Sequence, residues 1–262
     1  VNGTAGNAAE RSIEQTDIFQ VLDLAQAVSL PVDKDILHTI PQEYVVDTLE
    51  EIKNPQGMMG RRLEARVHLV TAASTAINNL ISCVEELGIS VEGLVFQPIA
   101  SSLAVLENDE MDLGVTLVEL GSNTTNIAVY HGSALRHSAT IPIGSASITN
   151  DIAVMLQITK KEAENIKIDY ASALSSMSSN ELEIQYHPNR ESKEKTISEQ
   201  EVSQYVEARM QEILQMIIRE ISRADIKDPL TYGIVMTGGG AELRNLSSLV
   251  ENNLNVKVRK GK

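Results

Sequence analysis

Two apolar runs that end abruptly in small residues stand out in the hydrophobic pattern of this chain. They are Leu113–Ala128, LGVTLVELGSNTTNIA, and Gly233–Ala241, GIVMTGGGA. Each has the pattern of a buried strand that leads into a tight turn. Small residues let backbone N–H groups come close to a phosphate, because no Cβ atom stands in the way. Either run alone is consistent with an ordinary turn, but the pair favours a nucleotide-binding site.

The pattern around the first run predicts three consecutive strands and a helix, a βββα arrangement. The strands are Leu113–Glu119, Thr125–Tyr130 and Ala134–Ile143, and the helix spans about Ser147–Leu156. Strands that alternate with helices indicate an α/β fold. The second run belongs to a strand at Tyr232–Met236, a helix at Glu242–Asn252 and a final strand at Leu254–Arg259.

Glu199–Ala224 is the clearest helix in the chain, because its apolar positions recur in steps of three and four for five turns. Packing in the core explains this face better than docking of a partner. Lys160–Ala173 also has the pattern of a helix, whereas the polar segment Ser175–Ser198 is expected to be exposed and mobile. The apolar positions of the long helix are Val202, Tyr205, Val206, Met210, Ile213, Leu214, Ile217, Ile218 and Ile221.

The first part of the chain predicts a small α+β module. Val1–Gln15 has no clear period and is expected to be a loop. Thr16 is a plausible N-cap for an amphipathic helix that ends before Pro31. Asp35–Val46 is expected to be extended, and Leu63–Leu69 alternates apolar and polar residues as a half-buried strand does.

Four short elements are expected between this module and the first glycine-containing run. A helix at Ala73–Leu87 ends at a glycine, and a short strand at Val91–Phe96 follows. A short helix at Ala100–Leu106 and a charged link at Asn108–Asp112 complete the segment. The single cysteine of the chain lies on the apolar side of the first helix, so we expect it, Cys83, to pack in the core.

Composition narrows the class of function. The formal net charge of −14 disfavours nucleic acid as a partner and direct adsorption to anionic lipid. No apolar run approaches the roughly 18 residues of a membrane span. One cysteine excludes an internal disulfide framework, and no two of the five histidines have helical ligand spacing. The chain begins at Val1 and not at methionine, which indicates a processed chain or a fragment.

The two glycine-containing turns suggest separate contacts to a nucleotide. Gly238, Gly239 and Gly240 precede a helix expected to begin near Ala241, where free N–H groups and the helix dipole would favour an anion. The first turn could supply a second phosphate contact through the amides and hydroxyls of Gly121, Thr124 and Thr125. Neither turn matches GxxxxGK[ST] or GxGxxG, which disfavours those two nucleotide folds.

Several longer motifs resemble the actin-like ATPases and, within them, the FtsA family of bacterial cell-division proteins. The resemblance runs over nearly the whole chain in the order of the family, and the RLEA-x-VH and NP-x-GM-x-G pieces are specific to it. The motifs are ILHTIPQEYVVD at Ile36–Asp47, NPQGMMGRRLEARVHLVTA at Asn54–Ala72, CVEELGISVEGLVFQPIASSLAVL at Cys83–Leu106, LGVTLVELGSNTTNIAVYHGSALRHSATIPIG at Leu113–Gly144 and MTGGGAEL at Met236–Leu243.

This resemblance implies an α/β, actin-like fold of two ribonuclease H-like βββα lobes with a small family-specific α+β subdomain. It implies ATP and Mg²⁺ between the lobes, head-to-tail polymerisation and binding of the C-terminal tail of FtsZ. It also implies a cytoplasmic protein, tethered to the inner membrane face by a C-terminal helix that would follow Lys262, with an opening segment before Val1. The implied divisions are 1–72 as the family-specific subdomain, 73–111 and 112–159 as lobe cores, 160–230 as a small subdomain and 231–262 as the return to the second lobe.

The resemblance also assigns site residues by position. Glu164 and Lys167 fall on the helix that contacts the ribose and adenine side. Glu119 falls on the position that holds the water shell of a magnesium ion. The cofactor-binding set is Gly121, Ser122, Asn123, Thr124, Thr125, Glu164, Lys167, Gly238, Gly239 and Gly240, and no residue is assigned to catalysis.

The second phosphate motif departs from the family pattern. It reads ELGSNTTN where DxGGGTTD is usual, with Glu119 and Asn126 in place of aspartates and Ser122 and Asn123 in place of glycines. The two added Cβ atoms hinder close approach of the backbone, and a residue other than glycine at positive φ would be strained. We therefore expect weak or absent hydrolysis of ATP, with binding retained through the adenosine side.

Two alternatives remain open at this stage. One is an actin-fold enzyme such as a sugar kinase or a chaperone-type ATPase, disfavoured by the missing aspartates. The other is the related adaptor of pilus assembly. For the cell-division reading, the contact with FtsZ is expected on Lys160–Arg223, with the long helix central and exposed charges such as Arg209 contributing.

Overall fold

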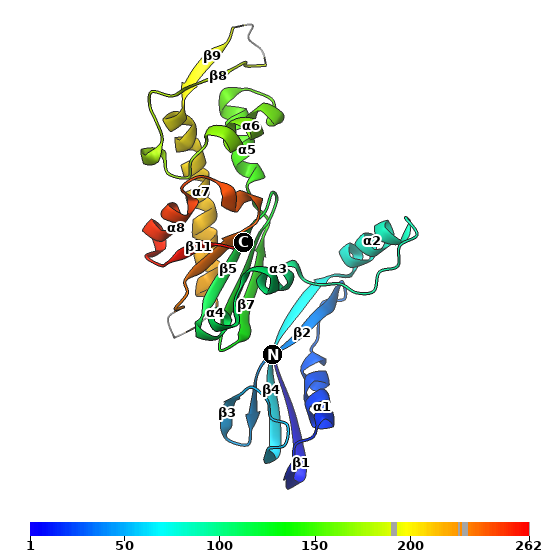
Figure 1. Cartoon of the computed structure of the whole chain (residues 1–262). Coiled ribbons are helices and arrows are strands. Elements are labelled where there is room, and N and C mark those ends of the chain that lie inside the picture. The colour runs from blue at the N-terminus through cyan, green and yellow to red at the C-terminus, as the bar shows by residue number, and fades with distance from the viewer. Residues whose placement is uncertain (190–192, 225, 227–229, 262) are drawn as a thin grey trace. The chain divides into compact units, whose positions relative to one another are not determined.

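The computed structural model describes residues 1–189, 193–224, 226 and 230–261. The chain separates into two compact units (Figure 1). The first comprises Val1–Ala100 with Ala134–Arg136, and the second comprises Ser101–Ser133 with His137–Lys262. Each unit has a hydrophobic cluster of its own.

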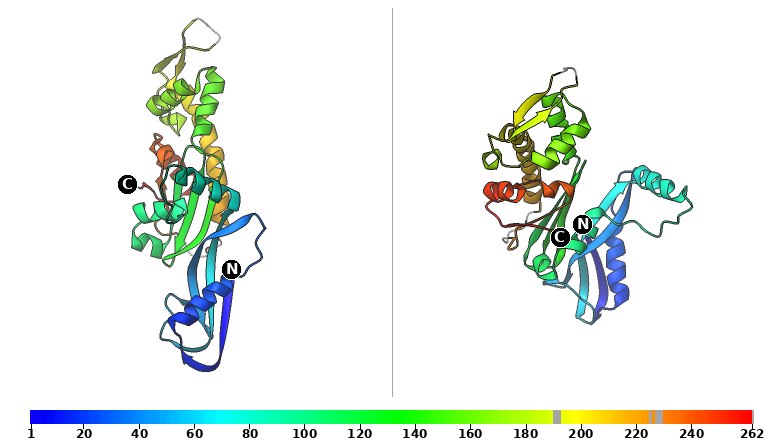
Figure 2. Two further views of the ribbon diagram at one scale, coloured as in Figure 1. Left: turned by 90° about the vertical axis from the view of Figure 1, so that its right-hand side faces the viewer. Right: turned by 45° about the horizontal axis from the view of Figure 1, so that its top comes forward.

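The first unit is an antiparallel sheet with one helix against it. The strands are β1 (Asn2–Ser12), β2 (Lys34–Val46), β3 (Leu49–Ile52) and β4 (Met59–Ala73), in the order β1-β4-β2-β3. Helix α1 (Gln15–Gln26) lies along β1 and β4 (Figure 2). Its buried side chains and the alternate side chains of β4 form the core, with members Ile13, Ile18, Val21, Ala25, Tyr44, Val46, Leu63, Ala65 and Val67.

The expected loop at Val1–Gln15 is wrong, because β1 occupies most of it. Small and polar residues form this strand since its hydrogen bonds come from β4, with Asn2 opposite Arg66. Gly3 is needed here, as a Cβ atom would lie 2.1 Å from the carbonyl oxygen of Val21 in α1. The expected cap at Thr16 is also wrong. Glu14 is the N-cap, and it exchanges side-chain and backbone hydrogen bonds with Asp17.

Helix α2 (Ser74–Glu85) confirms the helix expected after this sheet, but it contains no buried residue. Cys83 is therefore exposed, which corrects its expected place in the core. The strand expected at Val91–Phe96 has no regular structure, because its backbone joins no sheet among the described residues. The amide of Phe96 instead donates to His38 Nε2 at 2.9 Å.

The second unit is built on a five-stranded mixed sheet, and it confirms the three consecutive strands predicted from the sequence. These are β5 (Val115–Leu120), β6 (Thr125–His131) and β7 (Ala134–Ile141), with β10 (Ile234–Thr237) and β11 (Val258–Lys260) beside them. The first three residues of β7, Ala134–Arg136, are grouped with the first unit. The order is β11-β10-β5-β6-β7. Strand β10 runs parallel to β5 and β11, whereas β5 and β6 are antiparallel.

Helices pack against this sheet and against one another. In Figure 1, α7 (Glu199–Ser222) runs from the top of the unit down beside the sheet, and its apolar face is buried as predicted. The expected charged link at Asn108–Asp112 is instead a short helix, because Glu107 and Glu110 form a capping box. The other helices are α3 (Gln97–Val105), α4 (Asn108–Leu113), α5 (Ala146–Leu156), α6 (Lys160–Tyr170) and α8 (Leu246–Leu254).

The polar segment before α7 contributes to the core, contrary to expectation. It contains the 3₁₀ turn η1 (Ser175–Met177) and a hairpin of β8 (Glu183–Tyr186) and β9 (Lys195–Ser198). Ile184 and Ile197 face each other across the hairpin and are buried. Residues 190–192 of the predicted mobile segment lie outside the described residues. None of the helices described here has the length and apolar character needed to cross a membrane.

Candidate functional site

The two glycine-containing turns lie side by side, because β5 and β10 are parallel neighbours with Glu119 opposite Thr237. Gly238 has a φ of +85°, and a Cβ atom there would lie 2.6 Å from the carbonyl oxygen of Leu120. A Cβ atom at Gly240 would lie 2.4 Å from Leu120 Cγ. Contact between the two turns therefore requires glycine at both positions.

The turn after β5 is held against the start of α5. Its closing bond runs from the Gly121 amide to the Thr124 carbonyl at 2.9 Å. The amides of Ser145 and Ala146 donate to the carbonyls of Gly121 and Ser122 at 2.9 and 2.8 Å. These hydrogen bonds hold the turn in place, and they occupy the carbonyl groups of Gly121, Ser122 and Thr124.

The strain expected at Ser122 and Asn123 is not present. Neither residue has a positive φ, so neither needs the conformation that glycine adopts easily. The hydroxyl of Thr125 is buried and donates to the Ile143 carbonyl at 2.8 Å. Of the predicted phosphate contacts on this turn, Ser122 lines the pocket described below.

Glu119 belongs to a chain of side-chain hydrogen bonds across the sheet. Asn126 lies opposite Glu119 and donates to its carboxylate at 3.2 Å, while Thr140 donates to the Asn126 amide oxygen at 2.9 Å. The described residues contain no group of three or more His, Cys, Asp or Glu side chains arranged to bind a metal ion.

The second wall of the site is α6, where Glu164 and Lys167 form an ion pair at 2.8 Å. The buried hydroxyl of Thr149 on α5 joins them, at 2.5 Å from Glu164 and 3.0 Å from the Lys167 ammonium. Burial raises the pKa of the Glu164 carboxyl, but hydrogen bonds from Lys167 and Thr149 outweigh it and leave the pKa below its usual value. The carboxylate is therefore charged at neutral pH.

A pocket of about 440 Å³ lies between these walls, entirely within the second unit. It brings together five of the predicted residues: Ser122, Glu164, Lys167, Gly239 and Gly240. Gly121, Asn123, Thr124, Thr125, Gly238 and Glu119 lie outside its lining. The other lining residues are Ser145, Ile148, Ile168, Ala171, Glu242, Leu243 and Arg244.

The glycine turn does not open directly into an α-helix, which corrects the expected helix near Ala241. A 3₁₀ turn, η2 (Gly239–Glu242), follows Gly238, and α8 begins only at Leu246. The helix dipole argument therefore does not apply to this turn. The argument from close approach of the backbone still holds at Gly239, since a Cβ atom there would meet no atom within 4 Å.

Sequence reasoning missed Thr149 and Arg244. Thr149 could have been found as a hydroxyl between two buried isoleucines of a predicted helix. Arg244 follows the glycine turn closely, as the first basic residue after it. Its contacts with residues far along the chain could not be read from a local pattern.

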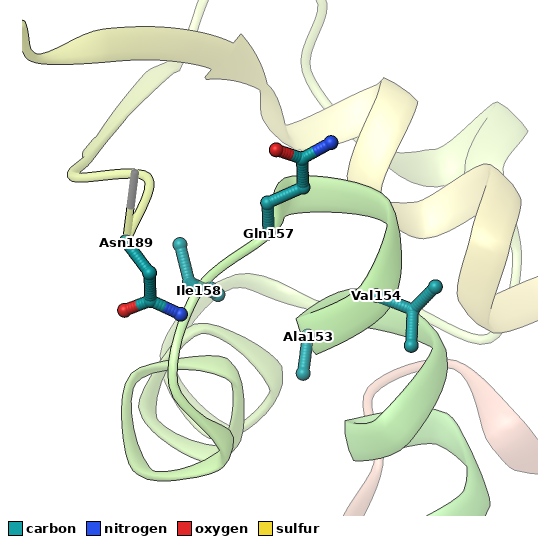
Figure 3. A pocket seen from close by; sticks show the side chains of 5 residues that line it. All are labelled: Ala153, Val154, Gln157, Ile158 and Asn189. Atoms are coloured by element: carbon teal, nitrogen blue, oxygen red, sulfur yellow. The ribbon is translucent and has the colours of Figure 1, made fainter. Parts of the chain in front are cut away.

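Two further hollows lie on the same unit. A groove of about 360 Å³ between α5 and α7 exposes Val154 and Met155, at 73% and 54% of their surfaces. Arg209 at its edge is not a freely exposed charge, since its guanidinium holds Asp151 on α5 at 2.6 and 2.9 Å. A smaller pocket of about 330 Å³ is bordered by Gln157 and Asn189, joined by a backbone hydrogen bond of 2.9 Å (Figure 3).

Both units match family models. A model described as "Cell division protein FtsA" matches residues 116–262, and one described as "SHS2 domain inserted in FTSA" matches residues 2–71. The chain belongs to the FtsA family. It is 39% identical to cell division protein FtsA of Pseudomonas aeruginosa over 96% of this chain and 60% of that protein. It is 34% identical to FtsA of Escherichia coli K12 over 97% of this chain and 62% of that protein.

The chain thus spans about 60% of the length of these FtsA relatives. Among solved structures, MreB5 of Spiroplasma citri bound to AMPPNP aligns with a TM-score of 0.62 at 19% identity, over 72% of this chain and 60% of that chain. The PilM–PilN type IV pilus biogenesis complex aligns with a TM-score of 0.60 at 16% identity, over 98% and 66%. The predicted α/β, actin-like fold is confirmed.

Proposed function

We propose that this FtsA-family chain binds ATP in the pocket between the glycine turn and α6. The observation that carries the proposal is the convergence of Ser122, Glu164, Lys167, Gly239 and Gly240 on one pocket. A solved neighbour of the same fold, MreB5, is described as bound to AMPPNP or to ADP. At this low identity the structural match supports the fold alone, and the pocket supports the site.

The residues of the pocket suit an adenosine nucleotide. The charged Glu164 carboxylate accepts hydrogen bonds, as a ribose would require, and the Lys167 ammonium lies beside it. Gly239 leaves a space that a Cβ atom would fill, so the backbone there can approach the ligand closely. The phosphates would extend toward Ser122 and the turn after β5. A magnesium ion would neutralise phosphate charge beside Glu119.

Gly239→Val in the full-length protein tests this site, because Gly239 lines the pocket and a Cβ atom there meets no other atom within 4 Å. We expect ATP affinity to fall at least about tenfold, with unchanged thermal unfolding. Gly93→Val is the matched control, as a Cβ atom there also meets nothing within 4 Å, in the other unit. Equal affinity of Gly239→Val and the unchanged protein for ATP would contradict the proposed site.

We also propose that hydrolysis is weak. The two aspartates usual in the phosphate motif are Glu119 and Asn126 here, and these two side chains are hydrogen-bonded to each other. The longer side chain of glutamate places its carboxylate away from the position that an aspartate would hold, and catalysis is sensitive to such displacements. Turnover of ATP with Mg²⁺ at rates typical of ordinary ATPases would contradict this part of the proposal.

The cell-division role of the family leads us to propose FtsZ as the partner. We place the C-terminal tail of FtsZ in the α5–α7 groove, because Val154 and Met155 offer an exposed apolar surface there.

The whole protein would polymerise head to tail and attach to the inner membrane face through a C-terminal helix. Membership of the FtsA family favours this role over a sugar kinase, a chaperone-type ATPase or a pilus adaptor.

Met155→Asp tests the groove by co-pelleting with FtsZ filaments. We expect less co-pelleting, since a carboxylate in an apolar contact must be desolvated. Met177→Asp is the control, because Met177 is similarly exposed, at 60% against 54%, and lies outside the groove. Equal co-pelleting of the two variants would show that the groove is not the contact with FtsZ. Arg209 is a poorer probe than expected, because its loss would also break the link to Asp151.

A further inference from the structure

Arg244 connects the walls of the proposed nucleotide pocket to one another. It lines the pocket just after the glycine turn. Its guanidinium donates to the Ala171 carbonyl at 3.2 Å and to the Tyr170 carbonyl, both at the C-terminal end of α6. This helix carries Glu164 and Lys167 into the pocket. A cation there also complements the partial negative charge of the helix end.

The same guanidinium pairs with Glu199, the first residue of α7. The Glu199 side chain is only 7% exposed, and its second oxygen accepts from the Ser179 amide at 2.7 Å. Burial raises the pKa of this carboxyl, but the hydrogen bonds from Arg244 and Ser179 outweigh burial and lower it. Three segments, namely the glycine turn, α6 and α7, thus meet at one side chain.

Two other hydrogen bonds hold the segment after the glycine turn against the chain that follows α6. The Ala173 amide donates to the Arg244 carbonyl at 2.8 Å, and Asn245 Nδ2 donates to Ser172 Oγ at 2.9 Å. These bonds do not involve the guanidinium. Loss of the guanidinium should therefore loosen the walls of the pocket without detaching the segments.

We propose that Arg244 is a positioning residue for the nucleotide, fixing α6 relative to the glycine turn with Glu199 as its anchor. The proposal rests on the proposed ATP site and adds to it a residue that acts on the adenosine side. Because the proposed site directs the phosphates toward the turn after β5, loss of Arg244 should weaken the binding of ATP and of ADP by the same factor.

The test is titration of the full-length protein with ATP and with ADP. The Arg244→Ala, Glu199→Gln double variant avoids leaving a buried charge unpaired. We expect affinity about tenfold weaker for both nucleotides, as expected for loss of charge-assisted hydrogen bonds. Arg244→Lys should be intermediate, because an ammonium can pair with Glu199 but cannot also span two carbonyls as a planar guanidinium does.

The matched control is the Arg259→Ala, Glu110→Gln double variant. This pair lies in the same unit and has similar exposure, 40% for Arg259 and 6% for Glu110, against 48% for Arg244 and 7% for Glu199. It should lower the temperature of unfolding comparably and leave nucleotide affinity unchanged. If the Arg244 double variant does not fold, Arg244→Lys carries the comparison.

Three outcomes would overturn the proposal, and they are distinguishable. Affinities of the Arg244 variants that match those of the control pair would show that Arg244 only stabilises the fold. A wild-type protein that binds neither ATP nor ADP would remove the nucleotide site itself, and the role of Arg244 with it. A deficit that appears for ATP and not for ADP would place Arg244 at the terminal phosphate of ATP and contradict a role on the adenosine side.

Discussion

Single glycines decide the geometry of the proposed site, and neighbouring glycines do so for different reasons. Gly238 needs its positive φ and its lack of a side chain, whereas Gly239 leaves open space in the pocket. Gly144 lies against the turn after β5, where a Cβ atom would be 2.5 Å from the Ser122 carbonyl oxygen. Ser122 itself has no such constraint. The turn is therefore shaped by the glycine it packs on.

Gly144→Ala should lower the free energy of unfolding by about 1–3 kcal/mol, because backbone atoms must move to admit the methyl group. Gly239→Ala should change it by no more than about 0.5 kcal/mol. Urea unfolding of both variants gives the comparison. Similar stabilities would mean that the turn after β5 can shift to admit a methyl group at Gly144 at little cost in free energy.

The buried carboxyl of Glu110 should make stability depend on acid pH. The hydrogen bond from Arg259 holds the pKa of Glu110 below its usual value, although burial acts in the opposite direction. A depressed pKa stabilises the folded state above the unfolded pKa, near 4.3, and this stabilisation is lost as pH falls through the folded pKa. Arg259→Ala should thus be less stable than wild type at neutral pH.

That difference in the free energy of unfolding should shrink below about pH 4. Denaturant unfolding of wild type and Arg259→Ala across acid and neutral pH measures it. A difference that stays constant over this range would exclude the ion pair as its cause.

At the scale of elements, periodicity identified α7 and the strands β5 to β7 but failed at β1 and at β8–β9. The strand β1 has few apolar side chains, and its structure depends on pairing with β4. The hairpin β8–β9 is polar except for alternate residues that enter the core, namely Ile184, Tyr186 and Ile197. A short strand with few apolar positions gives a weak signal, even where those positions are buried.

Ile184→Ala tests whether the hairpin belongs to the core. The side chain is 3% exposed, so its truncation should cost about 2–5 kcal/mol of unfolding free energy. Gln185→Ala, on the opposite, exposed face of the same strand, should cost no more than about 0.5 kcal/mol. Chemical denaturation would show the contrast, and equal effects would mean that the hairpin contributes little to folding.

At the scale of the whole molecule, the two hydrophobic clusters share no residue and lie in separate units. The family models fall on the same two regions, one ending at residue 71 and the other beginning at residue 116. Units with separate cores can unfold separately. The divisions at 72, 111, 159 and 230 implied by the resemblance remain predictions.

Calorimetry with one core substitution in each unit tests this independence. Val21→Ala should lower the unfolding temperature of one transition, by an amount equivalent to about 2 kcal/mol, and leave a second transition in place. Ile213→Ala, in the other core, should shift the second transition. A single transition that moves with either substitution would show one cooperative unit.

The sequence by itself determined the α/β class, the consecutive strands around LGSN, the long amphipathic helix and the family motifs. Strong periodicity reports which face of an element is buried, and glycine runs report tight turns, so both can be read locally. The sequence also indicated that the two glycine turns belong to one site. It could not show that Ser122 and Asn123 are unstrained or that a 3₁₀ turn follows Gly238.

Only the tertiary structure decided which side chains meet. Glu119 with Asn126, Thr149 with Glu164 and Arg244 with Glu199 are contacts between side chains on different elements. Such contacts depend on sheet order and helix packing, which no local pattern encodes. The same applies to Cys83, whose helix has an apolar side but packs against little. Amphipathic spacing predicts a face that can be buried, and the fold decides whether anything covers it.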